Sequence, residues 1–369
     1  VSGGLLTRSL SRLLAVDPGF DSKDLTAVEV SLPRYRYSSR EARTQFLDDV
    51  IDRLEAIPGI GTVSAAARLP FPGYTAGWTW WSEGRDEVYD PLGYPVVPGY
   101  LETMGVPLLA GRSLSDADRP GAPLAVVINE TMARRYWPDQ SPVGARYVMT
   151  GHEEPVTIVG VVGDMKRKVL DAQPEPTFFI PFSQLNLFSE LDICFVARSE
   201  LEPRQVLPLM RDAVWSVDGE LPIKSATTVD GLIAQSADHE RYAALLVSAF
   251  AILAALLAAA GVFGATARGV ASRTKEMGIR MALGARGSQL VATTMLAILY
   301  TGVAGIAVGL IGALWTSQLL SRFLFAIGPS DPTTYGAAAA LIVIVCLAAS
   351  YAPARRITKV SPVEVLRAE

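Results

Sequence analysis

Few side chains in this chain could act as nucleophiles or metal ligands, since 369 residues hold only two cysteines and two histidines. We expect His152 and His239, which are isolated in the sequence, to be surface residues rather than ligands or bases. Cys194 and Cys346 are too few for a metal cluster, and a disulfide between them is not expected because Cys346 lies in an apolar run. No Gly-x-x-x-x-Gly-Lys-Ser/Thr phosphate loop is present, so we expect no ATP hydrolysis by this chain itself. The sequence predicts no enzyme activity, no catalytic residue, no metal site and no cofactor in this chain.

Two other groups of side chains, three aspartates and three tryptophans, could act in catalysis or binding but are explained better by structural roles. Asp48, Asp49 and Asp52 fall on the polar face of a predicted helix, where a solvated surface explains them better than paired-carboxylate catalysis. The segment Pro70–Trp81 is rich in Pro and Gly and carries Trp78, Trp80 and Trp81. These rings could form a contact surface for a partner or a hydrophobic substrate. Packing in a core or hairpin is the preferred interpretation.

One charged segment remains, Arg273–Ala285, which reads RTKEMGIRMALGA. Within it, Ile279 and Leu283 have the spacing that places two residues on one face of a short helix. The segment lies between two long apolar runs, so it is well placed to touch a partner at a membrane surface. The alternative is a basic turn that only fixes the topology of the chain in the membrane. The residues alone leave both interpretations open.

The apolar runs predict membrane spans. Tyr242–Ala267 and Gly287–Ser321 contain no charged side chain, and each exceeds the roughly 20 apolar residues needed to cross a bilayer. A third run, Thr333–Ala354, follows a Pro- and Gly-rich turn. We predict three spans at about residues 242–267, 288–320 and 333–354, in a membrane domain that covers 241–369.

The basic residues predict the orientation of these spans. Five follow the first span and four follow the third, whereas the connection between the second and third has only Arg322. The nine are Arg268, Arg273, Lys275, Arg280, Arg286, Arg355, Arg356, Lys359 and Arg367. Basic residues favour the cytoplasmic side. We therefore predict that loop 268–286 and the tail 355–369 are cytoplasmic and that residues 17–240 lie outside.

Residues 17–240 predict a globular α+β domain. They hold 33 acidic and 20 basic residues, a net charge of −13, and the rest of the chain carries +9. This acidic character argues against a nucleic-acid partner. The pattern predicts strands at Val28–Leu32, Val63–Ala67, Leu124–Ile128, Val156–Val162 and Leu191–Ala197. It predicts helices at Ser38–Ile57 (capped by Ser38 or Ser39), Glu130–Trp137 (capped by Asn129), Pro203–Val217 and Thr227–Arg241, the last leading into the first span.

The chain begins abruptly, without the pattern of a secretory signal peptide. Val1–Leu6 is consistent with the last turns of a membrane helix, and Leu10, Leu13 and Leu14 with its continuation along the membrane surface. We interpret residues 1–16 as the end of a truncated membrane helix. The alternative is that the protein starts here.

Several motifs together resemble a known family. Glu276–Ala285 (EMGIRMALGA) is similar to the E-I-G-I-R-x-A-L-G-A signature of FtsX/MacB-like ABC transporter permeases, with Met277 in place of isoleucine. The ending Ala352–Arg356 with Ser361–Arg367 resembles that family's ending. Further matches are Asp17-Pro18-Gly19-Phe20, Pro58-Gly59-Ile60, Gly111-Arg112 and Val159–Asp164, which resemble a MacB-like periplasmic core domain. The resemblance covers nearly the whole chain and is strongest to the C-terminal half of duplicated orphan permeases.

This resemblance implies an α+β extracytoplasmic domain (MacB-like periplasmic core) followed by an α-helical transmembrane domain of three spans, with the family's first span all but missing. It implies a multi-pass protein of the bacterial cytoplasmic (inner) membrane with a periplasmic domain. The implied partners are an ABC ATPase subunit, which would bind ATP and Mg, a second permease half or homodimer partner, and membrane lipid. The implied ATPase-coupling residues are Arg273, Lys275, Glu276, Gly278, Ile279, Arg280, Ala282, Leu283 and Gly284.

The function that follows is a permease subunit that couples ATP hydrolysis by a separate ATPase to movement of its outside domain, for export by mechanotransmission. One alternative is an ATPase-linked regulator or scaffold of an extracytoplasmic enzyme, as in some FtsX-like relatives. Another is a membrane-anchored binding module that needs no ATPase.

Overall fold

The computed structural model describes residues 8, 16–70, 76–82, 88–150, 154–166, 173–185, 191–236, 238–272, 276, 279–280, 287–319 and 332–355. The chain divides into two compact units. One is Val16–Ala237, and the other joins Val1–Ala15 to Asp238–Glu369. His152 lies outside the described residues, and so do the residues of the family-like ending from Arg356 onward.

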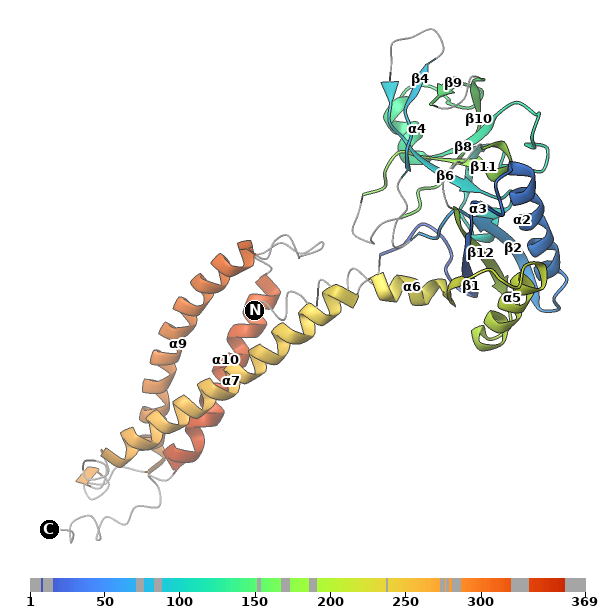
Figure 1. Ribbon diagram of the computed structural model, residues 1–369. Helices are drawn as coiled ribbons and strands as arrows, with labels where there is room; N and C mark the ends of the chain where they lie inside the picture. The colour runs from blue at the N-terminus through green and yellow to red at the C-terminus, as the bar shows by residue number, and fades with distance from the viewer. Residues whose placement is uncertain are drawn as a thin grey trace. The chain divides into compact units, whose positions relative to one another are not determined.

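A mixed sheet of thirteen strands forms the frame of Val16–Ala237 within the described residues (Figure 1). Its strands run in the order β13-β1-β12-β2-β6-β11-β8-β10-β9-β4-β5, with β3 beside β6 and β7 beside β10. Of the described strand pairs, only β8–β10 and β6–β11 are parallel. The strands are β1 (Leu25–Leu32), β2 (Ile60–Ala66), β3 (Ala76–Gly77), β4 (Trp80–Ser82), β5 (Val88–Tyr89), β6 (Leu92–Val96), β7 (Leu108–Gly111), β8 (Ala125–Asn129), β9 (Arg146–Met149), β10 (Val156–Val162), β11 (Thr177–Pro181), β12 (Leu191–Ser199) and β13 (Ile223–Thr228).

Helices cover this sheet. They are α2 (Arg40–Glu55), α3 (Tyr100–Thr103), α4 (Glu130–Tyr136), the short 3-10 helix η1 (Phe182–Gln184), α5 (Pro203–Val217) and α6 (Val229–Ser236). The Ser39 hydroxyl accepts a hydrogen bond from the Ala42 N–H at 3.1 Å, so Ser39, not Ser38, caps α2. Asn129 caps α4 in the same way, through the Met132 N–H at 3.0 Å. The predicted α+β class is confirmed.

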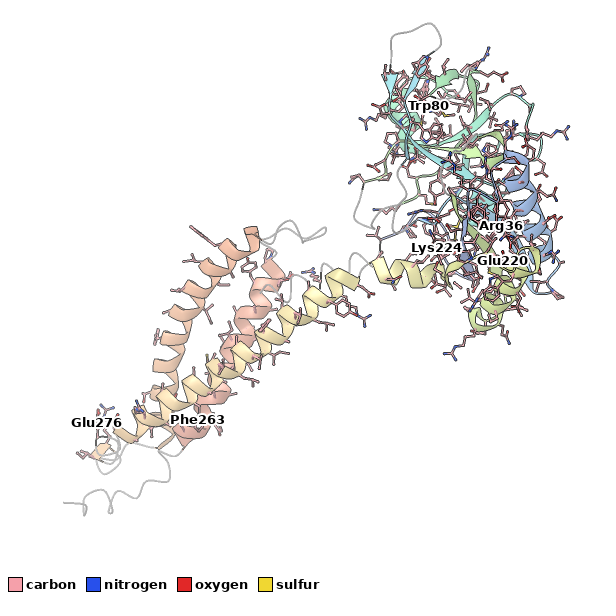
Figure 2. All side chains as sticks on the ribbon, viewed as in Figure 1. Arg36, Trp80, Glu220, Lys224, Phe263 and Glu276 are labelled. Carbon is pink, nitrogen blue, oxygen red and sulfur yellow. The ribbon has the colours of Figure 1, made fainter. Side chains whose placement is uncertain are left out.

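Two hydrophobic cores divide this unit into two lobes. The first lobe packs α2 and α5 together against β1, β2 and β12 (Figure 1). Every third or fourth residue of α2 is buried, as the sequence pattern predicts, and the buried set is Phe46, Leu47, Val50 and Leu54. The second lobe packs α4 against β8 and β10, with residues from β4, β9 and β11 completing its core. Trp80 is fully buried there (Figure 2), which confirms the core-packing interpretation for this ring, while Trp81 is 38% exposed.

The lobes meet at a narrow junction. A single residue pair, Ala66 with Val96, joins β2 to β6 in the sheet. Two backbone hydrogen bonds support it, from Ala67 N–H to the Pro95 carbonyl (2.9 Å) and from Val97 N–H to the Ala65 carbonyl (2.8 Å). Among the described strands, β2 and β6 are therefore the neighbours joined by the fewest paired residues.

In the described part of the second unit there are three long helices, α7 (Asp238–Ser272), α9 (Gly287–Leu319) and α10 (Pro332–Arg355), and α10 packs against both of the others. Among the residues that the structure describes, two stretches are long and apolar enough to cross a membrane, Arg241–Ser272 and Pro332–Tyr351. In α9 the described apolar stretch is the shorter Gly302–Trp315. The second predicted span, at about residues 288–320, stays a prediction.

The predicted helix over Thr227–Arg241 is wrong in its first two residues. Thr227 and Thr228 end strand β13, because each pairs with a residue of β1. Helix α6 starts at Val229 and ends at Ser236, and α7 starts at Asp238. Both threonines are β-branched, which suits a pleated strand better than a helix.

Candidate coupling site

The segment after α7 holds the predicted coupling residues, of which the structure describes Glu276, Ile279 and Arg280. A carboxylate oxygen of Glu276 accepts a hydrogen bond from the Arg280 guanidinium at 2.5 Å (Glu276 is labelled in Figure 2). Both side chains are more than half exposed, and Ile279 between them is 44% exposed. The other predicted members lie outside the described residues; they are Arg273, Lys275, Gly278, Ala282, Leu283 and Gly284.

This arrangement suits docking better than catalysis. Glu276 and Arg280 are one helical turn apart, so their ion pair supports a helical turn by about 0.3–0.5 kcal/mol. Ile279 is a branched apolar side chain in water beside that pair, where its burial by a partner would be favourable. Of the three, only Glu276 could ligate a metal ion, and its carboxylate is paired with Arg280.

The chain leaves the globular unit through β13 and α6. The Thr228 hydroxyl accepts a hydrogen bond from the Gly231 N–H at 3.0 Å, which satisfies a free donor at the start of α6. Val229 is buried, with 1% of its surface exposed. The last strand and the helix that follows it are thus anchored to the domain before the chain continues into α7.

The chain enters the domain through a tight turn at Asp17-Pro18-Gly19. The Asp17 carboxylate accepts the Gly19 N–H at 2.8 Å, and the Lys166 N–H donates to the Pro18 carbonyl at 2.8 Å. Gly19 has φ +81, and a Cβ there would lie 1.9 Å from the Asp164 carbonyl oxygen. Only glycine fits this position, which explains one of the motifs that resemble the family.

Arg198 of β12 holds the residues that follow this turn. Its guanidinium donates to the carbonyls of Lys23 (2.6 Å), Asp21 (2.9 Å) and Thr103 (3.0 Å). It also pairs with the Asp21 carboxylate at 3.2 Å. One side chain therefore fixes the entering chain and the end of α3 to strand β12.

The Gly111-Arg112 motif has a structural role as well. The Arg112 guanidinium forms two hydrogen bonds of 2.7 Å with the carboxylate of Asp118, which is 5% exposed. Burial raises the pKa of Asp118, but the bonds from Arg112 and from the Ser115 N–H outweigh it and hold that pKa below the usual range. Gly111 has φ +75, and a Cβ there would clash with the Val159 carbonyl.

The described residues contain no group of three His, Cys, Asp or Glu side chains that could hold a metal ion. Cys194 is fully buried in β12, and burial, helped by Glu29, raises the pKa of its thiol well above the ordinary value. A thiol in this state is a poor nucleophile. Cys194 therefore supplies no reactive nucleophile. Cys346 is a free cysteine of α10.

A groove of about 780 Å³ was not foreseen from the sequence. Asp48 and Asp52 are exposed on α2 as expected, but they also line this groove together with carboxylates that are distant in sequence. The acidic lining residues are Asp48, Asp52, Glu55, Glu102, Asp116 and Asp118. Burial and then repulsion from Asp52, Asp49 and Asp116 raise the pKa of Asp48. The groove therefore repels anions, and only the folded chain brings its two sides together.

Two family models match the chain. The MacB-like periplasmic core domain matches residues 6–213, and the FtsX-like permease C-terminal domain matches residues 248–362. Between them they cover most of both units. The first alone covers more than half of the chain.

Curated relatives are similar over most of this chain. A pyoverdine export ATP-binding/permease protein, PvdT, of Pseudomonas syringae pv. syringae is 26% identical over 269 residues, which are 71% of this chain and 40% of that protein. A probable syringafactin export ATP-binding/permease protein, SyfD, of Pseudomonas syringae pv. tomato is 26% identical over 291 residues, 72% of this chain and 40% of that protein. The chain spans about 40% of the length of these relatives.

Solved structures also match. The periplasmic region of MacB from Actinobacillus actinomycetemcomitans aligns with 56% of this chain and 90% of its own, at 15% identity and a TM-score of 0.40. The extracellular domain of the noncanonic ABC-type transporter YknZ from Gram-positive bacteria aligns with 54% of this chain and all of its own, at 17% identity and a TM-score of 0.38. Because both family models match in sequence order, the chain belongs to the FtsX-like permeases that carry a MacB-like periplasmic core domain.

Proposed function

We propose that this chain is a permease subunit of an ABC-type exporter that couples ATP hydrolysis in a separate ATPase subunit to movement of its extracytoplasmic domain. The observation that carries the proposal is the exposed Ile279 beside the Glu276–Arg280 pair, in the cytoplasmic segment implied between α7 and α9. Relatives named as ATP-binding/permease exporters support it. ATP and Mg would be bound by the ATPase, not by this chain.

The proposed mechanism is mechanical. Closure of two ATPase subunits on ATP would displace the segment around Ile279, and α7 would pass that displacement to α6 and β13, which follow one another along the chain. ATP must favour one of two arrangements for such coupling to exist. A symmetric assembly needs a second permease half or a second copy of this chain. The protein would then work in the bacterial inner membrane with residues 17–240 in the periplasm.

The test is ATPase stimulation by the full chain in lipid nanodiscs with its ATPase. Ile279→Asp removes the exposed apolar contact and adds a charge, so we expect stimulation to fall at least about tenfold, the effect of 1.4 kcal/mol. Replacement of Gly278 and Gly284 by bulky residues is expected to do the same. Ile279→Val is the matched control, because it keeps a branched apolar side chain and is expected to retain stimulation.

Unchanged stimulation by the Ile279→Asp protein, with the domain folded, would reject the coupling role. A bound extracytoplasmic hydrolase, with no exported molecule, would instead favour the regulator or scaffold. Full ligand binding in the absence of any ATPase would favour the membrane-anchored binding module.

A further inference from the structure

Strand β13 is the outermost strand of the first lobe, and an irregularity in it directs one lysine toward β12. Ser225 pairs with Glu29 and Ile223 pairs with Val30, so Lys224 is an extra residue on β13. Such a β-bulge turns a side chain away from its regular direction. The Lys224 ammonium reaches past β1 and donates a hydrogen bond to the Asp192 carboxylate of β12. Strands two apart are separated by about 10 Å, which a lysine and an aspartate together can span.

Asp192 holds a second cation from the opposite side. The Arg68 guanidinium, two residues after β2, donates to the other carboxylate oxygen at 2.6 Å. Asp192 is 10% exposed, while Lys224 and Arg68 are 44% and 43% exposed. Burial raises the pKa of Asp192, but hydrogen bonds from Lys224 and Ser31, the charge of Lys224 and the bond from Arg68 outweigh it and hold that pKa below the usual range. The carboxylate is therefore kept charged between two cations.

Arg68 also touches the second lobe. Its backbone carbonyl accepts a hydrogen bond from the hydroxyl of Tyr94, a fully buried residue of β6. The Tyr94 ring lies 5.8 Å from that of Phe179 in β11, centroid to centroid. Arg68 lies two residues after Ala66, whose pairing with Val96 joins the two halves of the sheet. The chain of contacts from Lys224 thus ends at the narrow junction between the lobes.

We propose that Asp192, with Lys224 and Arg68, forms a latch that ties β13 to the junction of the two lobes, so that a displacement of β13 is carried to both lobes. Figure 2 labels Lys224 beside the first lobe. The three are positioning residues. The inference rests on the proposed function in one respect, since the displacement it passes on would come from α7 through α6. The latch itself is a property of the domain and is tested without any ATPase.

The test uses the full chain in lipid nanodiscs, without nucleotide, and takes two readouts. Hydrogen exchange reports the β13 amides. Spin labels at Asp212→Cys in α5 and Asp139→Cys in the second lobe, both exposed positions, report the distance between lobes. Lys224→Met is expected to speed β13 exchange about tenfold and leave the distance distribution unchanged. Arg68→Met is expected to broaden the distribution and leave β13 exchange unchanged, and Asp192→Asn to change both.

Controls separate the latch from general loss of charge or stability. Lys224→Arg keeps the cation and is expected to restore β13 protection, and Lys23→Met removes an exposed lysine elsewhere and is expected to change neither readout. If Asp192→Asn does not fold, Lys224→Met and Arg68→Met still test whether each cation contributes to the latch. Unchanged β13 exchange in Lys224→Met, or an unchanged distance distribution in Arg68→Met, would overturn the proposal. ATPase stimulation in Ile279→Asp tests the proposed function and is measured separately. If stimulation is unchanged and the coupling role is rejected, the hydrogen-exchange and distance measurements still decide whether the latch exists.

Discussion

Arg112 holds Asp118 with both arms of its guanidinium at 2.7 Å, and the aspartate is 5% exposed while the arginine is half exposed. Asp118→Asn removes the charge from this fork, so we expect the domain to lose about 1–3 kcal/mol of unfolding free energy. Five of the six tryptophans lie before residue 216, so tryptophan fluorescence during urea unfolding reports the domain. Asp116→Asn, at an exposed neighbour in the same turn, is the matched control and is expected to change stability by less than about 0.5 kcal/mol.

The same pair predicts a pH dependence. The pKa of Asp118 is lower in the folded protein than its ordinary value, so the folded state binds fewer protons than the unfolded state. Its stabilising contribution is complete above the ordinary carboxyl range and is lost as pH falls below about 4, toward the folded pKa. The unfolding free energy should therefore fall less steeply with decreasing pH, below about pH 4, in Asp118→Asn than in the wild type. Parallel curves would show that the carboxylate does not titrate with folding.

A substitution of Arg198 tests whether this side chain holds residues 21–23 in place where the chain enters the domain. The two terminal guanidinium nitrogens of Arg198 share the carbonyls of Asp21, Lys23 and Thr103 between them, whereas a lysine has one nitrogen and lacks this planar fork. We expect Arg198→Lys to lower the unfolding free energy by about 1–3 kcal/mol. We also expect faster proteolysis at residues 17–24. Arg204→Lys, at an exposed position in α5, keeps the charge balance identical and should leave both measurements unchanged.

The two adjacent serines before α2 make a matched pair. Only Ser39 accepts the Ala42 N–H, so Ser39→Ala is expected to cost about 1 kcal/mol of unfolding free energy and Ser38→Ala much less. Urea unfolding of both variants measures the difference. Equal losses would mean that the cap hydrogen bond contributes nothing beyond the change of residue type.

Membrane orientation is tested by labelling single cysteines in a Cys346→Ala background, where Cys194 is buried. An impermeant maleimide added to spheroplasts is expected to label Asp139→Cys at once and Glu276→Cys only after permeabilisation. The reason is the excess of basic residues around Glu276 and in the C-terminal tail. Labelling of Glu276→Cys in intact spheroplasts would reverse the proposed topology.

The sequence pattern within a segment was enough to predict those strands and helices that depend mainly on their own residues. Strand β10 and helix α5 have the predicted bounds, because β-branched runs and helical periodicity are local signals. The predicted helix wrongly included Thr227 and Thr228, the last two residues of β13, because their extended form depends on pairing with β1, about 200 residues away in sequence. No local pattern carries that information.

Site prediction met the same limit. The four-residue spacing of Glu276 and Arg280 in the sequence could have predicted their ion pair. The contacts of Lys224 could not be predicted, because a β-bulge decides which way its side chain points. The acidic groove likewise depends on tertiary structure, since Glu102 and Asp116 come from segments far along the chain from α2. The glycines of two family-like motifs, Gly19 and Gly111, have positive φ values, so the structure explains why glycine stands at these positions.

The extra residue in β13 has one more consequence, for solubility. An exposed strand at the end of a sheet is a template for pairing with another chain, and bulges and lysines are known means of preventing it. At this end of the strand order the protein has both, at Lys224. At the other end, β5 is only two residues long, too short to nucleate a new ladder. Both ends of the strand order are thus poor templates, so copies crowded in one membrane can collide without fusing their sheets into aggregates.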